Sequence, residues 1–127
     1  MIKESEIYVC EICGKIVEVL RDGSGELVCC GQAMTLEKAK VDDSENAEKH
    51  VPSAKRNGNR VEVMIGSVEH PMEREHYIEW IETTQGNRSK RVALQSGDRP
   101  TAEFCVEEGP ALVRTYCNIH GLWKKEI

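Results

Sequence analysis

The chain has 127 residues, of which 39% are hydrophobic and 31% charged, a balance that permits a folded core and argues against wholesale disorder. Its formal net charge is -5 and it has no run of Lys or Arg that could follow a nucleic-acid backbone, so nucleic acid is not an expected partner. The length suits one ordinary domain, or a small module attached to a domain of about 90 residues.

Secretory and membrane signals are not visible in the sequence. Residues 1–20 lack the basic start, apolar run and small-residue cleavage site of a secretory signal, and no stretch reaches about 18 consecutive apolar residues. We therefore expect a cytoplasmic protein without a membrane partner. In that reducing compartment the six cysteines are expected to be metal ligands or free thiols, not disulfides.

Two pairs of cysteines lie close together in the N-terminal part of the chain. Cys10 and Cys13 form a Cys-x-x-Cys turn followed by Gly14, which can adopt the left-handed backbone that such knuckles often need. Cys29 and Cys30 are adjacent, so they can share one metal ion only if the backbone bends there. About 30 residues cannot fold on buried apolar surface alone. We expect a four-thiolate metal site of distorted tetrahedral shape, for which zinc and iron both remain open.

The segment 38–49 is polar and charged and shows neither helical nor alternating apolar periodicity. It predicts a linker, with a domain boundary near residue 38.

From residue 50 onward, short apolar or alternating stretches are separated by turn signals. Arg60–Ile65 alternates apolar and polar residues, which is the pattern of a half-buried strand. Further strands are expected at 76–83, 91–94, 102–106 and 111–117. The predicted fold class is all-β, an antiparallel β-sandwich preceded by the small metal module. Cys105, inside one of these strands, is expected to be a packed free thiol.

The four histidines and Cys117 form a second group of candidate ligands. Cys117 and His120 are three positions apart, a spacing at which a tight turn directs both side chains at one metal ion. His50 and His70 each lie one or two residues before a proline, so we expect them on extended or looped backbone, and His76 opens a predicted strand. Any one histidine alone is more often a surface or hydrogen-bonded residue.

If these five residues converge, four imidazoles and one thiolate exceed the quota of a structural zinc site. They suit a redox metal with a square of nitrogens, an axial sulfur and one open position for a small anion. Spacing shows that the ligands exist and leaves their convergence open.

Five parts of the sequence together resemble one known family. They are the two cysteine pairs and the segments 48–52 (EKHVP), 70–80 (HPMEREHYIEW) and 116–123 (YCNIHGLW). In this order, over nearly the whole chain, they resemble desulfoferrodoxin, the two-iron class of superoxide reductase. The resemblance implies an enzyme that reduces superoxide to hydrogen peroxide without releasing dioxygen, in defence against oxidative stress. It also implies a homodimer that takes electrons from rubredoxin or a similar small donor.

The same resemblance implies the domains and the ligands of two iron ions per chain. Residues 1–37 would be a desulforedoxin-like domain, 38–49 the linker and active-site loop, and 50–127 an immunoglobulin-like β-sandwich that carries the active site. The first iron would be bound by Cys10, Cys13, Cys29 and Cys30. The second would have His50, His70, His76 and His120 as equatorial ligands and Cys117 as the axial ligand.

Glu48 and Lys49 directly precede the first histidine. Lys49 could present a positive charge at the open position and steer superoxide over about 10 Å at 0.1 M salt; the alternative is a solvated surface lysine. By resemblance, Glu48 would close the sixth position of the oxidised iron as a hard oxygen ligand; the alternative is a surface carboxylate.

A second class of function is compatible with the same residues. The chain could be a non-enzymatic metal module, either a simple iron electron carrier or a zinc-stabilised interaction domain. Metal analysis with visible spectroscopy separates these from a two-iron enzyme.

Overall fold

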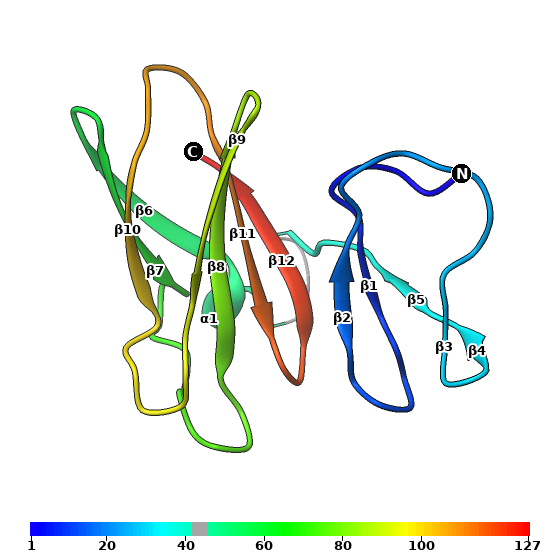
Figure 1. Ribbon diagram of the computed structural model, residues 1–127. Coiled ribbons are helices and arrows are strands. Elements are labelled where there is room, and N and C mark those ends of the chain that lie inside the picture. The colour runs from blue at the N-terminus through cyan, green and yellow to red at the C-terminus, as the bar shows by residue number, and fades with distance from the viewer. Residues whose placement is uncertain (42–45) are drawn as a thin grey trace. The chain divides into compact units, whose positions relative to one another are not determined.

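The computed structural model describes residues 1–41 and 46–127; residues 42–45, which belong to the predicted linker, lie outside the described residues. The chain forms two compact units, Met1–Lys38 and Ala39–Ile127. Both are built almost entirely from antiparallel strands (Figure 1), so the predicted all-β fold class is confirmed. Within residues 1–41 and 46–127, no helix has the length and apolar character needed to cross a membrane.

The first unit consists of two small antiparallel sheets. One has the order β2-β1-β5, and the other is a two-stranded hairpin, β3-β4. Their strands are β1 (Ile7–Val9), β2 (Ile16–Glu18), β3 (Val28–Cys29), β4 (Gln32–Ala33) and β5 (Thr35–Glu37). Across this fully described unit, only Ile7 and Cys10 among the hydrophobic residues are buried. So small a core cannot stabilise a fold by itself, and the unit needs a metal ion or a partner.

The second unit contains two antiparallel sheets with the strand orders β10-β7-β6 and β12-β11-β8-β9. Its elements are α1 (Ala47–His50), β6 (Pro52–Asn57), β7 (Arg60–Ile65), β8 (Ile78–Gln85), β9 (Arg88–Ala93), β10 (Thr101–Cys105), β11 (Leu112–Cys117) and β12 (Gly121–Glu126).

The core of this unit joins its two sheets. Val61, Val63 and Ile65 alternate with more exposed residues along β7, and they pack in one buried cluster with Ile81 and Val113 of the other sheet. The period-two pattern that predicted β7 therefore arises because one face of that strand is buried. The predicted antiparallel sandwich is confirmed.

In the second unit, the strands β6 and β12 have no counterpart in the sequence prediction. Their sequences, PSAKRN and GLWKKE, carry charged residues at consecutive positions and end exposed. Each strand lies at the edge of its sheet, where charges and proline are tolerated and discourage further pairing. Alternation is therefore weak in these two strands, and a search for alternation misses them.

The expectation that His50 lies on extended or looped backbone is wrong, because His50 completes the single helical turn α1. Proline restricts mainly the residue directly before it. Here that residue is Val51, which is extended (φ -69°, ψ 125°) and ends the turn. The turn begins after Asn46, which has a left-handed backbone (φ 66°).

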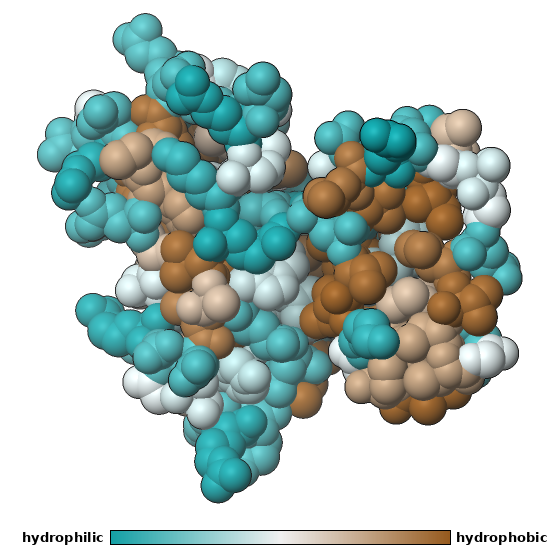
Figure 2. Space-filling view, viewed as in Figure 1, coloured by the Kyte–Doolittle hydropathy of each residue, from teal (hydrophilic) through white to brown (hydrophobic). Residues whose placement is uncertain are grey.

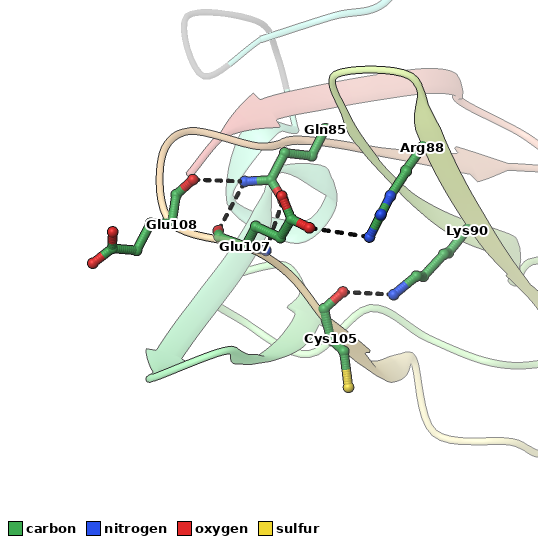
Figure 3. Close-up of polar contacts among 6 residues, drawn as sticks. All are labelled: Gln85, Arg88, Lys90, Cys105, Glu107 and Glu108. Carbon is green, nitrogen blue, oxygen red and sulfur yellow. Dashed lines mark hydrogen bonds and ion pairs between the residues drawn. The ribbon is translucent and has the colours of Figure 1, made fainter.

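The expectation that Cys105 is a packed thiol is also wrong, because its side chain is exposed. Cys105 ends β10, and successive side chains of a strand point to opposite faces. Phe104 takes the buried position, which leaves Cys105 on the outer face. The Cys105 carbonyl accepts a hydrogen bond from Lys90 Nζ at 2.7 Å (Figure 3).

The crossover from β10 to β11 is held by side chains from both sheets, of which Figure 3 shows Gln85 and Arg88. Gln85 of β8 donates from Nε2 to the Glu107 carbonyl at 2.9 Å and accepts the Glu107 N–H at 2.8 Å. Arg56 of β6 donates to the carbonyls of Gly109 and Glu107 at 2.6 and 2.8 Å. Arg88 pairs with the Glu107 carboxylate at 3.1 Å. These contacts connect the two sheets at the crossover.

Glu82 of β8 is 1% exposed and lies opposite an arginine on each side, Arg114 of β11 and Arg91 of β9. Arg114 Nε donates to Oε1 at 2.7 Å, and Arg91 pairs with Oε2. Burial alone would raise the pKa of Glu82, but the hydrogen bonds and charges of the two arginines outweigh it and hold that pKa below its usual value.

We expect Glu82→Gln to lower the free energy of unfolding by about 3–5 kcal/mol at pH 7, because the buried Arg114 guanidinium loses its counter-charge. The stabilisation by Glu82 is complete above the unfolded pKa of 4.5 and is lost as the pH falls through the depressed folded value. The difference from wild type should therefore shrink below about pH 5. Urea denaturation at neutral and acid pH measures this difference.

The matched control is Glu103→Gln, which removes a carboxylate from the exposed pair with Arg60 and should cost less than about 1 kcal/mol. Protonation of other groups at acid pH affects the wild type and both variants alike. It therefore cancels when the free energy of unfolding of each variant is compared with that of the wild type. A loss for Glu82→Gln that does not vary with pH would contradict the prediction.

Candidate metal centres

The first unit brings its four paired cysteines together. Their sulfur atoms all lie within 4.8 Å of one another: Cys10, Cys13, Cys29 and Cys30. Cys29 Sγ is 3.7 Å from Cys13 Sγ and 3.9 Å from Cys30 Sγ. Four sulfurs placed tetrahedrally at a metal–sulfur distance of about 2.3 Å would be about 3.8 Å apart. The cluster therefore has the size of a site for one tetrahedral metal ion.

The backbone adopts the conformations that this cluster requires. Cys30 has a left-handed φ of 53°, which provides the bend predicted between the adjacent cysteines. Gly14 has φ 79°, as expected for the residue after the first pair, and its N–H donates to the Cys10 carbonyl at 2.9 Å. Both sequence-based expectations about the backbone are confirmed.

The neighbouring thiols of this cluster oppose the ionisation of Cys29 and Cys30, and they raise the pKa of both. The backbone N–H groups of Cys13 and Ile12 lower the pKa of Cys10 to about 6. Hydrogen bonds with the Cys13 and Cys10 sulfurs raise the pKa of Cys30 to about 12. A cation at the centre would remove this conflict, since each thiolate would face a positive charge. The all-sulfur donor set fits zinc or iron.

The second unit brings together the five residues of the other predicted group. Ligand atoms of four of them lie within 4.8 Å of one another: His50, His76, Cys117 and His120. His70 joins them through its Nε2, which is 3.1 Å from His50 Nε2. The convergence that spacing left open is therefore present in the structure.

The four imidazole rings surround one point. Neighbouring ring centroids are separated by 4.6 Å (His50 and His70), 4.7 Å (His70 and His76), 5.1 Å (His76 and His120) and 4.7 Å (His120 and His50). The diagonal from His50 to His76 is longer, at 6.4 Å. Such a square suits four nitrogens around one metal ion. Cys117 Sγ, 3.9 Å from His120 Nδ1, is close enough to be the fifth ligand.

Backbone carbonyls orient two of the rings. His50 Nδ1 lies 2.9 Å from the Asn46 carbonyl, and His70 Nδ1 lies 2.6 Å from the Pro71 carbonyl. A proton on each Nδ1 satisfies these contacts and leaves each Nε2 with a free lone pair. Within the described part of the chain, His76 Nε2 is buried and has no hydrogen-bond partner. A metal ion would give this orphaned nitrogen its partner.

The protonation states also fit metal binding. Burial lowers the pKa of His50 and His120, and it lowers that of His70 to about 4. These rings are therefore neutral near pH 7 and can act as ligands. Burial raises the pKa of Cys117, partly offset by the backbone N–H groups of His120 and Ile119. The thiol needs a nearby cation in order to ionise.

Asn118 is a positioning residue that sequence reasoning missed. Its Nδ2 donates to the Glu75 carbonyl at 3.0 Å, its Oδ1 accepts the Tyr77 N–H at 2.9 Å, and its own N–H donates to the Tyr77 carbonyl at 3.2 Å. Glu75 and Tyr77 flank His76 in the sequence. Asn118 thus ties the segment of His76 to the turn between Cys117 and His120. The sequence feature that could have indicated this role is the place of Asn118 inside a turn, where Asn is favoured.

A turn at Gly66 holds the backbone of α1. The Glu48 carbonyl accepts the N–H groups of Ser67 and Val68 at 2.8 and 3.1 Å. Gly66 has φ 88°, and a Cβ there would lie 2.2 Å from the Val68 carbonyl oxygen and 2.8 Å from that of Lys49. Only glycine fits this approach. The side chains of Glu48 and Lys49 are exposed, and among the described residues the Glu48 carboxylate does not belong to the clustered ligand atoms.

Comparison with known proteins divides the chain into an N-terminal and a C-terminal part, as the structure does. The family model of desulfoferrodoxin matches residues 42–126, and the model of the desulfoferrodoxin N-terminal domain matches residues 2–36. A desulfoferrodoxin homolog of Archaeoglobus fulgidus is 52% identical over 124 residues, which cover 98% of each chain. A superoxide reductase of Pyrococcus abyssi is 35% identical over 99 residues, which cover 63% of this chain and 86% of the relative.

Among solved structures, the superoxide reductase from Treponema pallidum superposes with a TM-score of 0.79. The match covers 97% of this chain and 98% of that one, at 22% sequence identity. At this identity the likeness shows a shared fold over almost the whole chain.

We expect Asn118→Ala to weaken zinc binding by the second cluster about 10- to 100-fold, because the segment carrying His76 loses its attachment. Zinc competition titrations in a Cys13→Ser background, where the first cluster lacks one thiolate, measure the dissociation constant. Asn118→Asp keeps the acceptor for the Tyr77 N–H but loses the donor to Glu75, so its affinity should be intermediate. An unchanged dissociation constant in Asn118→Ala would refute the positioning role.

Proposed function

This chain belongs to the desulfoferrodoxin family, and we propose that it is a superoxide reductase that converts superoxide to hydrogen peroxide in oxidative-stress defence. One observation carries the proposal: four imidazoles surround one point beside a buried thiol, and one of their nitrogens has no partner in the described residues. Four nitrogens and one sulfur leave a six-coordinate metal with one position for a substrate. The second-cluster ligands are His50, His70, His76, Cys117 and His120.

The two clusters have different roles in this proposal. Residues 1–37 hold one iron through four thiolates and have no spare ligand position, so this centre transfers electrons or stabilises the unit. Residues 38–49 form the linker and active-site loop, and residues 50–127 carry the catalytic iron. The exposed sulfur ligands Cys13 and Cys30 offer an entry point for electrons from rubredoxin or a similar small donor.

An iron ion held by these residues would supply the one electron that superoxide, with two protons, needs in order to become hydrogen peroxide. The Cys117 thiolate contributes electron density and one negative charge, while the four imidazoles stay neutral. Iron(II) held by these ligands would carry a formal charge of +1 and would attract a small anion. His50, His70 and Cys117 are buried, whereas His76 and His120 are only half-buried. The substrate therefore approaches past the latter two rings.

The exposed surface of the first unit supports a homodimer. Leu20 and Val28 are 80% and 59% exposed, and a groove of about 480 Å³ is lined in part by Val17, Leu27 and Met34. Figure 2 shows apolar side chains gathered over this unit. A second copy would cover them and add the apolar burial that so small a unit lacks. The six unpaired cysteines support a reducing, cytoplasmic location.

The decisive experiment combines metal analysis, visible spectroscopy and superoxide consumption. We expect two irons per chain, consumption of superoxide with peroxide as product, and loss of a sulfur-to-iron charge-transfer band in Cys117→Ser. Cys13→Ser should disrupt the first centre, while chemically reduced protein still consumes superoxide. A colourless protein with two zinc ions would support an interaction module, and two irons without superoxide consumption would support an electron carrier.

Lys49 and Glu48 supply the charges of the open position in this proposal. We expect Lys49→Ala to slow the second-order reaction with superoxide by about tenfold at low salt and to weaken its salt dependence, because the steering charge is removed. Pulse radiolysis at several ionic strengths measures the rate. Glu48→Ala should instead change the ferric spectrum and its pH dependence, because the oxidised iron loses an oxygen ligand. Equal rates for wild type and Lys49→Ala at low salt would rule out steering.

A further inference from the structure

Lys40 is attached to the four-histidine cluster although it is far from every ligand in the sequence. Its backbone pairs with β12: the Lys40 N–H donates to the Leu122 carbonyl at 2.9 Å, and the Lys124 N–H donates to the Lys40 carbonyl at 3.0 Å. Its side chain continues toward the metal centre, where Nζ donates to the His120 carbonyl at 2.9 Å.

Trp123 connects the same lysine to a second ligand. The indole is 1% exposed and stacks on the His50 ring, with centroids 4.7 Å apart and planes at 15°. Its Nε1 donates to the His120 carbonyl at 3.2 Å, and Lys40 Nζ lies 5.3 Å from its ring centroid. The His120 carbonyl thus receives two donors. A cation over an indole ring is attracted by the ring's quadrupole, so Lys40 helps to fix both Trp123 and His120.

The positive charge of Lys40 also acts on the ligands. Lys40 Nζ lies 2.9 Å from the carbonyl oxygen of His120 and 5.3 Å from the centroid of the indole that stacks on His50, so its charge is next to two members of the cluster. In the described residues the Lys49 ammonium makes no hydrogen bond or ion pair, whereas the Lys40 ammonium is held at the His120 carbonyl. The two lysines therefore differ: Lys49 is exposed, whereas the Lys40 ammonium is bonded to the His120 carbonyl.

We propose that Lys40 is a positioning residue of the second metal centre, which holds His120 and Trp123 in place and keeps a fixed positive charge beside the iron. A positive charge disfavours the more highly charged ferric state, so Lys40 raises the reduction potential of this iron. The inference rests on the proposed superoxide reductase function, since it assumes a redox iron at this site.

Potentiometric titration of the iron-loaded full chain tests the charge. We expect Lys40→Met, which removes the charge and the donor, to lower the midpoint potential of the second iron. That difference should shrink as ionic strength rises, because salt screens an exposed charge. Lys40→Arg should restore the wild-type potential. The matched control is Lys38→Met, because Lys38 is an exposed lysine two residues earlier and makes none of these contacts among the described residues.

Nuclear magnetic resonance on the zinc-loaded full chain tests the positioning without iron or activity. We expect the Gly121 amide nitrogen, which is bonded to the His120 carbonyl carbon, and the Trp123 indole N–H to shift in Lys40→Met. They should stay in place in Lys38→Met. Loss of metal from Lys40→Met but not from Lys40→Arg would support the same role.

An unchanged potential and unchanged Gly121 and Trp123 signals in Lys40→Met would overturn the proposal, as would equal changes in Lys38→Met. A shift of potential that does not depend on salt would overturn the charge effect. Superoxide consumption by the wild-type chain is measured separately. If the wild-type chain consumes superoxide but Lys40→Met does not change the midpoint potential, this inference alone is refuted. If Lys40→Met changes the potential but the wild-type chain does not consume superoxide, the proposed function alone is refuted.

Discussion

The second unit depends on the gathering of four imidazoles and one buried thiol around a single point. Burial disfavours the charged forms of His50 and His70, and it also disfavours the Cys117 thiolate. Such a cluster is unfavourable unless a cation fills it. The surrounding fold must then hold the donors in place from several directions, because they come from α1, the segments before β8, the end of β11 and the turn that follows it. The buried core between the sheets provides that rigidity.

The two units reach stability in different ways. The second has a continuous apolar cluster between two sheets, joined further by Glu82 and its arginines and by the side-chain contacts at the β10–β11 crossover. The first buries little more than Ile7 and Cys10. For the first unit, the free energy of metal binding is in large part the free energy of folding. A four-thiolate centre there would thus stabilise the structure, whatever its part in electron transfer.

The sequence predicted most where a local pattern determines the outcome. β7 follows from strict alternation, and the bend at Cys30 follows from the need of two adjacent thiols to reach one ion. The errors came from the neighbourhood of single residues: Val51 takes the restriction imposed by proline and leaves His50 helical, and Phe104 takes the inward position and leaves Cys105 exposed. In both cases the outcome depends on which of two neighbouring residues takes the restricted or the inward-facing position.

The residues that organise the site were harder to predict, because their partners are distant in sequence. Asn118 lies inside a recognisable motif, but its bonds go to a segment about 40 residues away. Lys40 lies 80 residues from His120 and has no motif at all. Its contact exists because residue 40 pairs with the edge strand β12.

That pairing has a consequence for the electrostatics of the site. An edge strand leaves backbone groups free to accept another segment, and the bridge between Lys40 and Trp123 of β12 brings an ammonium group to the His120 carbonyl. The chain is net negative, and charges beyond about 10 Å are screened at 0.1 M salt, so total charge says little about the field at an anion-binding metal. Fixed local charges determine it. In this fold the position of such a charge is set by backbone pairing at the edge of a sheet, which allows the site to be tuned without changing any ligand.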